Sequence, residues 1–109
     1  MAGSSRTLAD GLLPSAAQAL YTVPDGMVAT IDWLSIYNNT AGNVVCTFFL
    51  RRFGSSRRFS RTDLAASGGH AEIITRESQR TLAEGDAIEG FAASGNVIEF
   101  ALTGTEAPA

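Results

Sequence analysis

Apolar and polar residues alternate in short runs along most of the chain, a pattern that predicts half-buried β-strands. Turn-forming Gly, Pro, Asn and Asp residues interrupt these runs at intervals of about 8–12 residues, which is typical of β-sandwiches. We therefore predict a single antiparallel β-sandwich or jelly roll of about 7–8 strands. The expected strands cover residues 20–23, 27–38, 44–53, 57–62, 70–75, 87–92 and 97–102, and a polar stretch leads through Thr81-Leu82 into a turn at residues 83–86.

The segment at residues 27–38 contains a local irregularity. Ahead of it, Pro24-Asp25-Gly26 is a strong turn signal, because Pro presets φ and Gly tolerates the positive φ that such turns need. Within the segment, the three-residue step from Ile31 to Leu34 breaks strict alternation of the core candidates. We expect a β-bulge near Asp32-Trp33, which would return both residues to one face.

The last two strand segments predict a β-hairpin. Residues 87–92 and 97–102 are joined near Gly95-Asn96, a dipeptide that favours a turn. Alternation in the second segment places three core candidates on one face, namely Ile98, Phe100 and Leu102.

The first 18 residues differ from the rest of the sequence. They show no steady period, and Gly3, Gly11 and Pro14 interrupt any helix or strand that begins there. We expect an extended N-terminal arm at residues 1–18, followed by a β-sandwich domain at residues 19–109. The arm would dock onto a neighbouring molecule. Its apolar anchors would be Leu8, Leu12 and Leu13.

The composition indicates one globular domain in a chain of 109 residues. Apolar residues make up 45% and charged residues 17%, a balance typical of a folded β-rich chain. No apolar run approaches the roughly 18 residues of a membrane helix. The first residues also lack the basic start and apolar block of a secretory signal. We therefore expect a protein that is made and kept in the cytosol, or released from it by lysis, and that does not contact membranes.

Residues 51–61 hold five of the eight basic residues, although the formal net charge of the chain is −3. Arginines interleaved with phenylalanines suit phosphate contact and base stacking. The acidity of the whole chain argues against nucleic acid as the partner. A solvated hairpin and a contact with carboxylates of another protein are the other interpretations, and we favour the protein contact. The candidate interface residues in this segment are Arg51, Arg52, Phe53, Arg57, Arg58, Phe59 and Arg61.

The register of this arginine hairpin decides which side chains pair. If the loop has an even number of residues, we expect Phe53 to face Arg58 and Arg52 to face Phe59, giving two guanidinium–aromatic contacts. A three-residue loop would instead place Arg52 opposite Arg58, an unfavourable pair of like charges. The sequence leaves both registers open.

Candidate catalytic and metal-binding groups are few. His70 is the only histidine and no nucleophile elbow lies near it, so we expect no enzymatic activity. Glu84, Asp86 and Glu89 surround a glycine turn, but their spacing matches no EF-hand loop, and we expect neither a metal nor a cofactor. Cys46 is the only cysteine, and its apolar neighbours would raise its pKa rather than activate it.

Three segments of the sequence resemble a small β-sandwich module that is frequent among virion proteins of tailed bacteriophages. In that group an opening LYTVP-x-G leads into a bulged I-x-x-L-x-I-x-N-x-T strand, and an L-x-x-GD-x-I turn precedes the terminal hairpin. These patterns match residues 20–26, 31–40 and 82–88. The resemblance covers residues 19–104, and the arginine hairpin is an insertion between its two halves.

The resemblance implies a non-enzymatic structural protein located in the virion. It implies a capsid decoration or cement protein that binds the outer shell as an oligomer, commonly a trimer. Its partners would be other copies of itself and the major capsid protein or another virion protein. A tail, collar or fibre component is the alternative within the particle. A carbohydrate- or receptor-binding module is the alternative of another class, with Trp33, Tyr37 and Tyr21 as sugar-stacking residues, although a Trp beside a bulge is more often packed than exposed.

Overall fold

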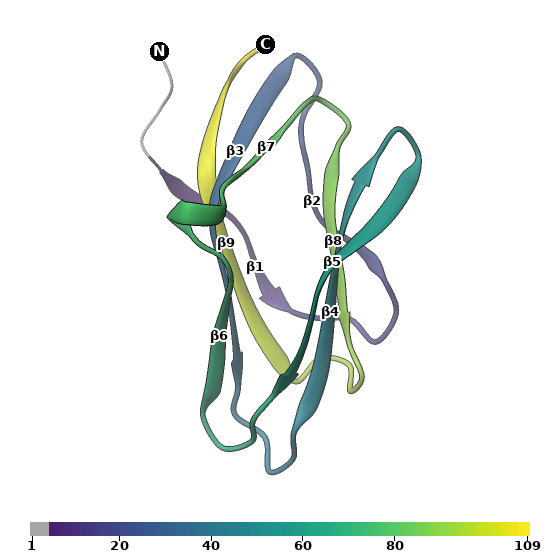
Figure 1. Cartoon of the computed structure of the whole chain (residues 1–109), viewed down its shortest axis with the longest axis vertical. Helices are drawn as coiled ribbons and strands as arrows, with labels where there is room; N and C mark the ends of the chain where they lie inside the picture. Colours follow the sequence, from purple (N-terminus) through teal and green to yellow (C-terminus); the bar gives the residue numbers. More distant parts are fainter. Residues whose placement is uncertain (1–4) are drawn as a thin grey trace.

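The computed structural model describes residues 5–109, which form two antiparallel β-sheets packed face to face (Figure 1). The first sheet has the strand order β1-β9-β3-β6, and β7 also pairs with β3. Its strands are β1 (Arg6–Leu12), β3 (Met27–Asn38), β6 (Gly69–Ile74), β7 (Arg80–Leu82) and β9 (Ile98–Pro108). The second sheet, in the order β2-β8-β4-β5, contains β2 (Gln18–Thr22), β4 (Val44–Arg52), β5 (Ser55–Leu64) and β8 (Ala87–Ala92). A short 3-10 helix, η1 (Arg76–Ser78), precedes β7. The predicted β-sandwich is confirmed.

Strand β3 runs through the middle of the first sheet and contains the predicted bulge. Its register against β9 shifts between Ile31 and Trp33, which confirms that prediction. Ile31 and Leu34 are consequently both fully buried, whereas the Trp33 side chain is partly exposed. Because of the bulge, one face of β3 packs into the core and the other face is turned toward solvent.

The hydrophobic core lies between the two sheets and takes alternate residues from both. Phe48 on β4 is its largest fully buried side chain. On β9, the predicted core face is confirmed, because Ile98, Phe100 and Leu102 are all buried. Burial of each such side chain contributes about 1.5–3 kcal/mol, so this core fixes the strands from which the exposed side chains project.

The predicted hairpin of the last two strands is wrong. β8 pairs with β2 and β4 in the second sheet, whereas β9 pairs with β1 and β3 in the first. Residues 93–97 therefore cross between the sheets. Backbone hydrogen bonds hold this crossing against the β1–β2 connection, where Asn96 N–H donates to Leu13 O and Leu13 N–H donates to Ile98 O. Strand β8 is buried along almost its whole length, which suits a central strand with neighbours on both edges.

The N-terminal segment belongs to the sandwich from Arg6 onward. β1 pairs with β9 from Arg6 to Leu12 and forms an edge of the first sheet. Leu13 is fully buried in the core, and Leu8 is partly buried against it. Residues 1–4 of the expected arm lie outside the described residues. The expected boundary between residues 18 and 19 falls at the start of β2, within one sandwich.

Candidate functional site: an arginine hairpin and an acidic aromatic groove

Strands β4 and β5 form the arginine hairpin, whose tip projects from the side of the sandwich (Figure 1). Arg52 pairs with Ser55, so the loop consists of Phe53 and Gly54 alone. Both loop residues have positive φ, 54° for Phe53 and 76° for Gly54, which is the backbone of a two-residue hairpin turn. The register differs from both predicted ones, because the turn begins at Phe53 rather than after it.

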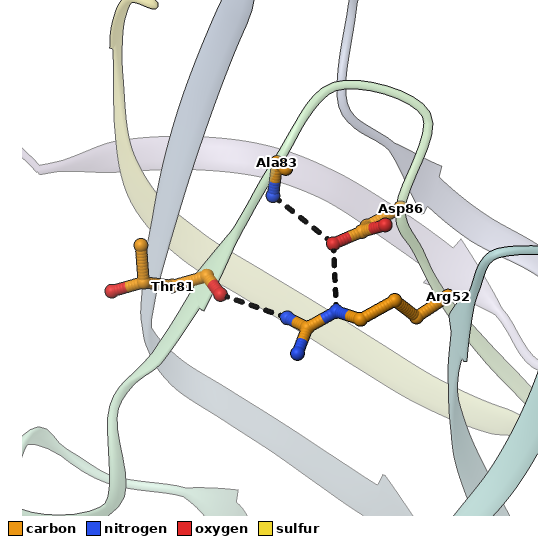
Figure 2. Close-up of polar contacts among 4 residues, drawn as sticks. All are labelled: Arg52, Thr81, Ala83 and Asp86. Atoms are coloured by element: carbon orange, nitrogen blue, oxygen red, sulfur yellow. Dashed lines mark hydrogen bonds and ion pairs between the residues drawn. The ribbon is translucent and has the colours of Figure 1, made fainter.

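Arg52 fastens the hairpin to the turn between β7 and β8 (Figure 2). Its Nε donates to Asp86 Oδ2 at 3.0 Å, and its Nη2 donates to the backbone oxygen of Thr81 at 3.1 Å. The same Asp86 oxygen accepts the backbone N–H of Ala83 at 3.1 Å. One buried carboxylate therefore closes the turn and holds the tip end of the hairpin.

Arg51 makes a second ion pair within the chain. Its Nη1 lies 3.6 Å from Oε2 of Glu89, a buried residue of β8. The other carboxylate oxygen of Glu89 accepts the hydroxyl of Ser56 on β5. Two of the five clustered arginines therefore pair with carboxylates of their own chain, although their side chains stay 51% and 44% exposed.

Three arginines of β5 remain exposed, and we call Arg57, Arg58 and Arg61 the free arginines. Among residues 5–109, none of them has a carboxylate oxygen within 4.0 Å. Arg57 pairs with Leu50 and Arg58 with Phe49, so these two project from opposite faces of the hairpin. Together with Phe53, whose side chain is 97% exposed at the tip, they form a cationic and aromatic projection.

Phe59 has an internal role rather than an exposed one. The register of β5 against β4 shifts at this point, and Phe59 turns inward to pack on Phe48, with ring centroids 6.5 Å apart. The guanidinium of Arg80 lies 5.0 Å from the centroid of the Phe59 ring. The expected guanidinium–aromatic contacts within the hairpin are therefore replaced by one with β7. The bulge that turns Phe59 inward is the reason.

The three leucines of the N-terminal segment lie in different surroundings. Leu13 fills the core of its own chain and offers no surface to a neighbour. Leu8 packs partly against the same core. Leu12 is 49% exposed at the end of β1 and is the one member of the trio that presents a substantial apolar surface.

The outer face of the first sheet contains an open groove of about 960 Å³ that sequence reasoning missed. Trp33 and Tyr37 stand two rows apart on β3, each 38% exposed. Trp33 is therefore exposed, contrary to the expectation that it packs beside the bulge. The groove is also lined by the carboxylates of Asp10, Glu72 and Glu99 and by the imidazole of His70. The alternation of Trp33, Ser35 and Tyr37 was the only local signal of this face.

The strand register places these groups in rows across four strands. One row runs from Asp10 through Ala101 and Ser35 to Glu72. The next row contains Leu12, Glu99, Tyr37 and His70. The groove thus has acidic groups at both ends of one row and aromatic rings along its middle strand. We call it the acidic aromatic groove.

The acidic turn considered for a cation has other contacts. Asp86 and Glu89 accept the internal hydrogen bonds of the hairpin, and Glu84 accepts the backbone N–H of Gly26 at 3.3 Å. Within the described part of the chain, no group of three or more His, Cys, Asp or Glu side chains could hold a metal ion. Residues 5–109 also contain no helix long and apolar enough to cross a membrane.

Cys46 is fully buried, and burial raises the pKa of its thiol to about 11, with a smaller contribution from Asp63. The thiol is therefore protonated at neutral pH and is a poor nucleophile. This agrees with its expected role as a core residue.

Comparisons with known proteins give one structural neighbour. No family model matches the chain, and no curated protein matches it. A solved structure described as a pentameric capsid protein isolated from metagenomic phage sequences matches with a TM-score of 0.44 and 10% sequence identity. The match covers 94% of this chain and 67% of that one. A match at this identity and score is too weak to transfer the neighbour's function.

Proposed function

We propose that the chain is a non-enzymatic structural protein of a phage particle, a capsid decoration protein that binds the outer shell as an oligomer. The resemblance to virion modules supports this proposal, and two of its three segments meet in the structure. Val23 N–H donates to Asp86 O, and Gly85 N–H donates to Val23 O, so the turn at residues 20–26 is bonded to the turn at residues 82–88. These two segments thus lie together at one end of the sandwich, while the third, at residues 31–40, runs along β3.

The observation that carries the proposal is the exposed tip of a braced hairpin. Phe53 is 97% exposed at the tip of the hairpin that carries the free arginines, while Arg51 and Arg52, directly before the turn, bind β8 and its preceding turn. Large exposed aromatic groups beside arginine are typical of protein contact surfaces. A projection that is already held beside its tip loses little conformational freedom on binding.

A decoration protein acts mechanically. Each copy contributes a contact that spans neighbouring shell subunits, and standard interfaces bury about 1,200–2,000 Å² of total surface. Repeated over the shell, such contacts resist the outward pressure of packaged DNA. Charge complementarity sets the orientation of each copy and speeds its encounter with the shell.

The test uses particles that lack this protein. Purified protein is added back, and bound copies and the temperature of DNA release are measured. We expect the wild type to saturate the shell and raise the release temperature. The Arg57→Glu/Arg58→Glu variant should bind at least tenfold less, while Arg76→Glu, which changes an exposed arginine of η1, should bind normally. Wild-type protein that leaves the release temperature unchanged and does not bind would refute the proposal.

A second function of another class is favoured by a specific observation. Trp33 and Tyr37 are both exposed on one face of β3, together with carboxylates, in the acidic aromatic groove, an arrangement that also suits a saccharide. A carbohydrate- or receptor-binding module would show saccharide binding on a glycan array, and Trp33→Ala would abolish it. A tail, collar or fibre position is the alternative within the particle and would give few copies per virion.

A further inference from the structure

Phe53 lies at a position where its side chain contributes almost nothing to the stability of its own chain. Its backbone lies in the left-handed region at φ 54°, where Asn, Asp or Gly is normally found and a bulky side chain is uncommon. Its ring is 97% exposed and so gains almost nothing from the core. Strain combined with exposure at a rigid tip points to a contact outside the chain.

The acidic aromatic groove has the complementary chemistry. Carboxylates pair with guanidinium groups, and the faces of Trp and Tyr attract both guanidinium groups and other aromatic rings. Asp10 and Glu72 stand at the two ends of one row, three strand spacings apart. At about 4.8 Å per strand, Asp10 and Glu72 are about 14 Å apart, which leaves room between them for the edge of a hairpin.

We propose that the acidic aromatic groove of one copy receives the hairpin tip of a second copy of this chain. Phe53 enters between Trp33 and Tyr37, and the guanidinium groups of Arg57 and Arg58 reach the carboxylates on either side. The two arginines project from opposite faces of the hairpin, which matches carboxylates at opposite ends of the row. This inference names the contact inside the oligomer of the proposed function and rests on that oligomer.

The position of the two surfaces determines the kind of assembly. The hairpin belongs to the second sheet and projects away from the first sheet, whose outer face contains the groove (Figure 1). A chain therefore does not fill its own groove, and hairpin and groove are different surfaces. A contact between two different surfaces repeats from copy to copy and closes into a ring when the rotation permits.

Charge reversal on each surface provides the test. Sedimentation velocity measures the assembly of the wild type, of Arg57→Glu/Arg58→Glu and of Asp10→Arg/Glu72→Arg. We expect the wild type to be oligomeric at micromolar concentration and each variant alone to associate at least tenfold more weakly. Arg76→Glu is the matched control, because it reverses an exposed arginine outside both surfaces.

Mixing the two variants separates a lost contact from a lost fold. In a mixture at equal amounts, every hairpin finds a groove of opposite charge on the other variant, so association should return to within a few fold of the wild type. A misfolded variant would not be rescued in this way. No recovery on mixing, a monomeric wild type, or an equal loss with Arg76→Glu would overturn the inference. Saccharide binding abolished by Trp33→Ala, with self-association unchanged, would assign the groove to a sugar instead.

The two proposals fail in different ways. If the wild type binds particles as a monomer, the self-contact is wrong and the decoration role stands. If the variants dissociate and recover on mixing, but no form binds particles, the self-contact stands and the decoration role is wrong.

Discussion

Arg52 on β4 and Asp86 in the turn before β8 form an ion pair with Nε and Oδ2 3.0 Å apart. The two side chains differ in burial, since Arg52 is 44% exposed and Asp86 only 7%. The pair joins the projecting hairpin to the end of the sandwich that contains the virion-like turns. The carboxylate is the critical partner, because it also closes its own turn through Ala83 N–H.

Replacing Asp86 with alanine should therefore destabilise the protein more than replacing Arg52 with methionine. We expect Asp86→Ala to lower the free energy of unfolding by about 2–3 kcal/mol, because it leaves a backbone N–H and a guanidinium unpaired. Arg52→Met should cost about 1 kcal/mol or less, because that guanidinium is partly solvated. Urea unfolding gives both values, with Glu77→Ala, at an exposed carboxylate of η1, as the control. Equal losses for the two variants would contradict the assigned role of Asp86.

Gly104 on β9 should tolerate no side chain. A Cβ at this position would lie 2.2 Å from the backbone oxygen of Thr30, next to the bulge of β3. We expect Gly104→Ala to lower the free energy of unfolding by about 3 kcal/mol or more, because the backbone of β3 or β9 would have to move to relieve this clash. Gly42→Ala is the matched control, since a Cβ there meets nothing within 4 Å, and it should change stability by less than about 0.5 kcal/mol. Similar values for both would argue against this packing.

Phe53 should show opposite effects on stability and on assembly. We expect Phe53→Asn to raise the free energy of unfolding of the monomer by about 0.5–1 kcal/mol, because Asn tolerates the left-handed backbone. The same variant should associate at least tenfold more weakly. Phe53→Ala separates the two effects, because it removes the ring without relieving the backbone. Unfolding at a concentration where all forms are monomeric, together with sedimentation, checks this prediction, and a Phe53→Asn that assembles normally would refute it.

Cys46 should be unreactive until the protein unfolds. Burial raises the pKa of its thiol to about 11, so iodoacetamide at pH 8 should label native protein far more slowly than protein in urea. Labelling kinetics by mass spectrometry measures the ratio, and equal rates would mean that the thiol is exposed.

The same raised pKa predicts a loss of stability in alkali. The stabilising contribution of the protonated thiol is fully present below its ordinary pKa of 9.0. It is lost as pH rises from there to about 11, because the unfolded chain releases the proton first. The pKa of Tyr21 is raised in the same direction, by burial and by its hydrogen bond to Glu106. Urea midpoints measured across this range should fall with pH.

Features that depend on local residue patterns could be predicted from the sequence. The interrupted alternation between Ile31 and Leu34 located the bulge, and the alternation of Ile98, Phe100 and Leu102 located a core face. Alternation identifies a face and leaves the neighbouring strand undetermined, which is why β8 and β9 were wrongly joined as a hairpin. The choice between pairing and crossing depends on where Leu13 holds the connecting loop.

The candidate site was only partly predictable for the same reason. The arginine cluster is visible in the sequence. Its division into paired and free arginines depends on Asp86 and Glu89, which lie in β8 and the turn before it and are distant in sequence. The sequence did not predict the turn at Phe53, because phenylalanine is not a turn-forming residue and rarely adopts the positive φ that it has here. The acidic aromatic groove requires four strands from separate parts of the chain, so no local pattern reveals it.

Counting this chain in purified particles tests the central claim most directly. Quantitative mass spectrometry of particles from a phage that encodes the sequence gives its copy number relative to the major capsid protein. A decoration role predicts a copy number comparable to that of the shell subunit. A handful of copies per particle, or none, would contradict it.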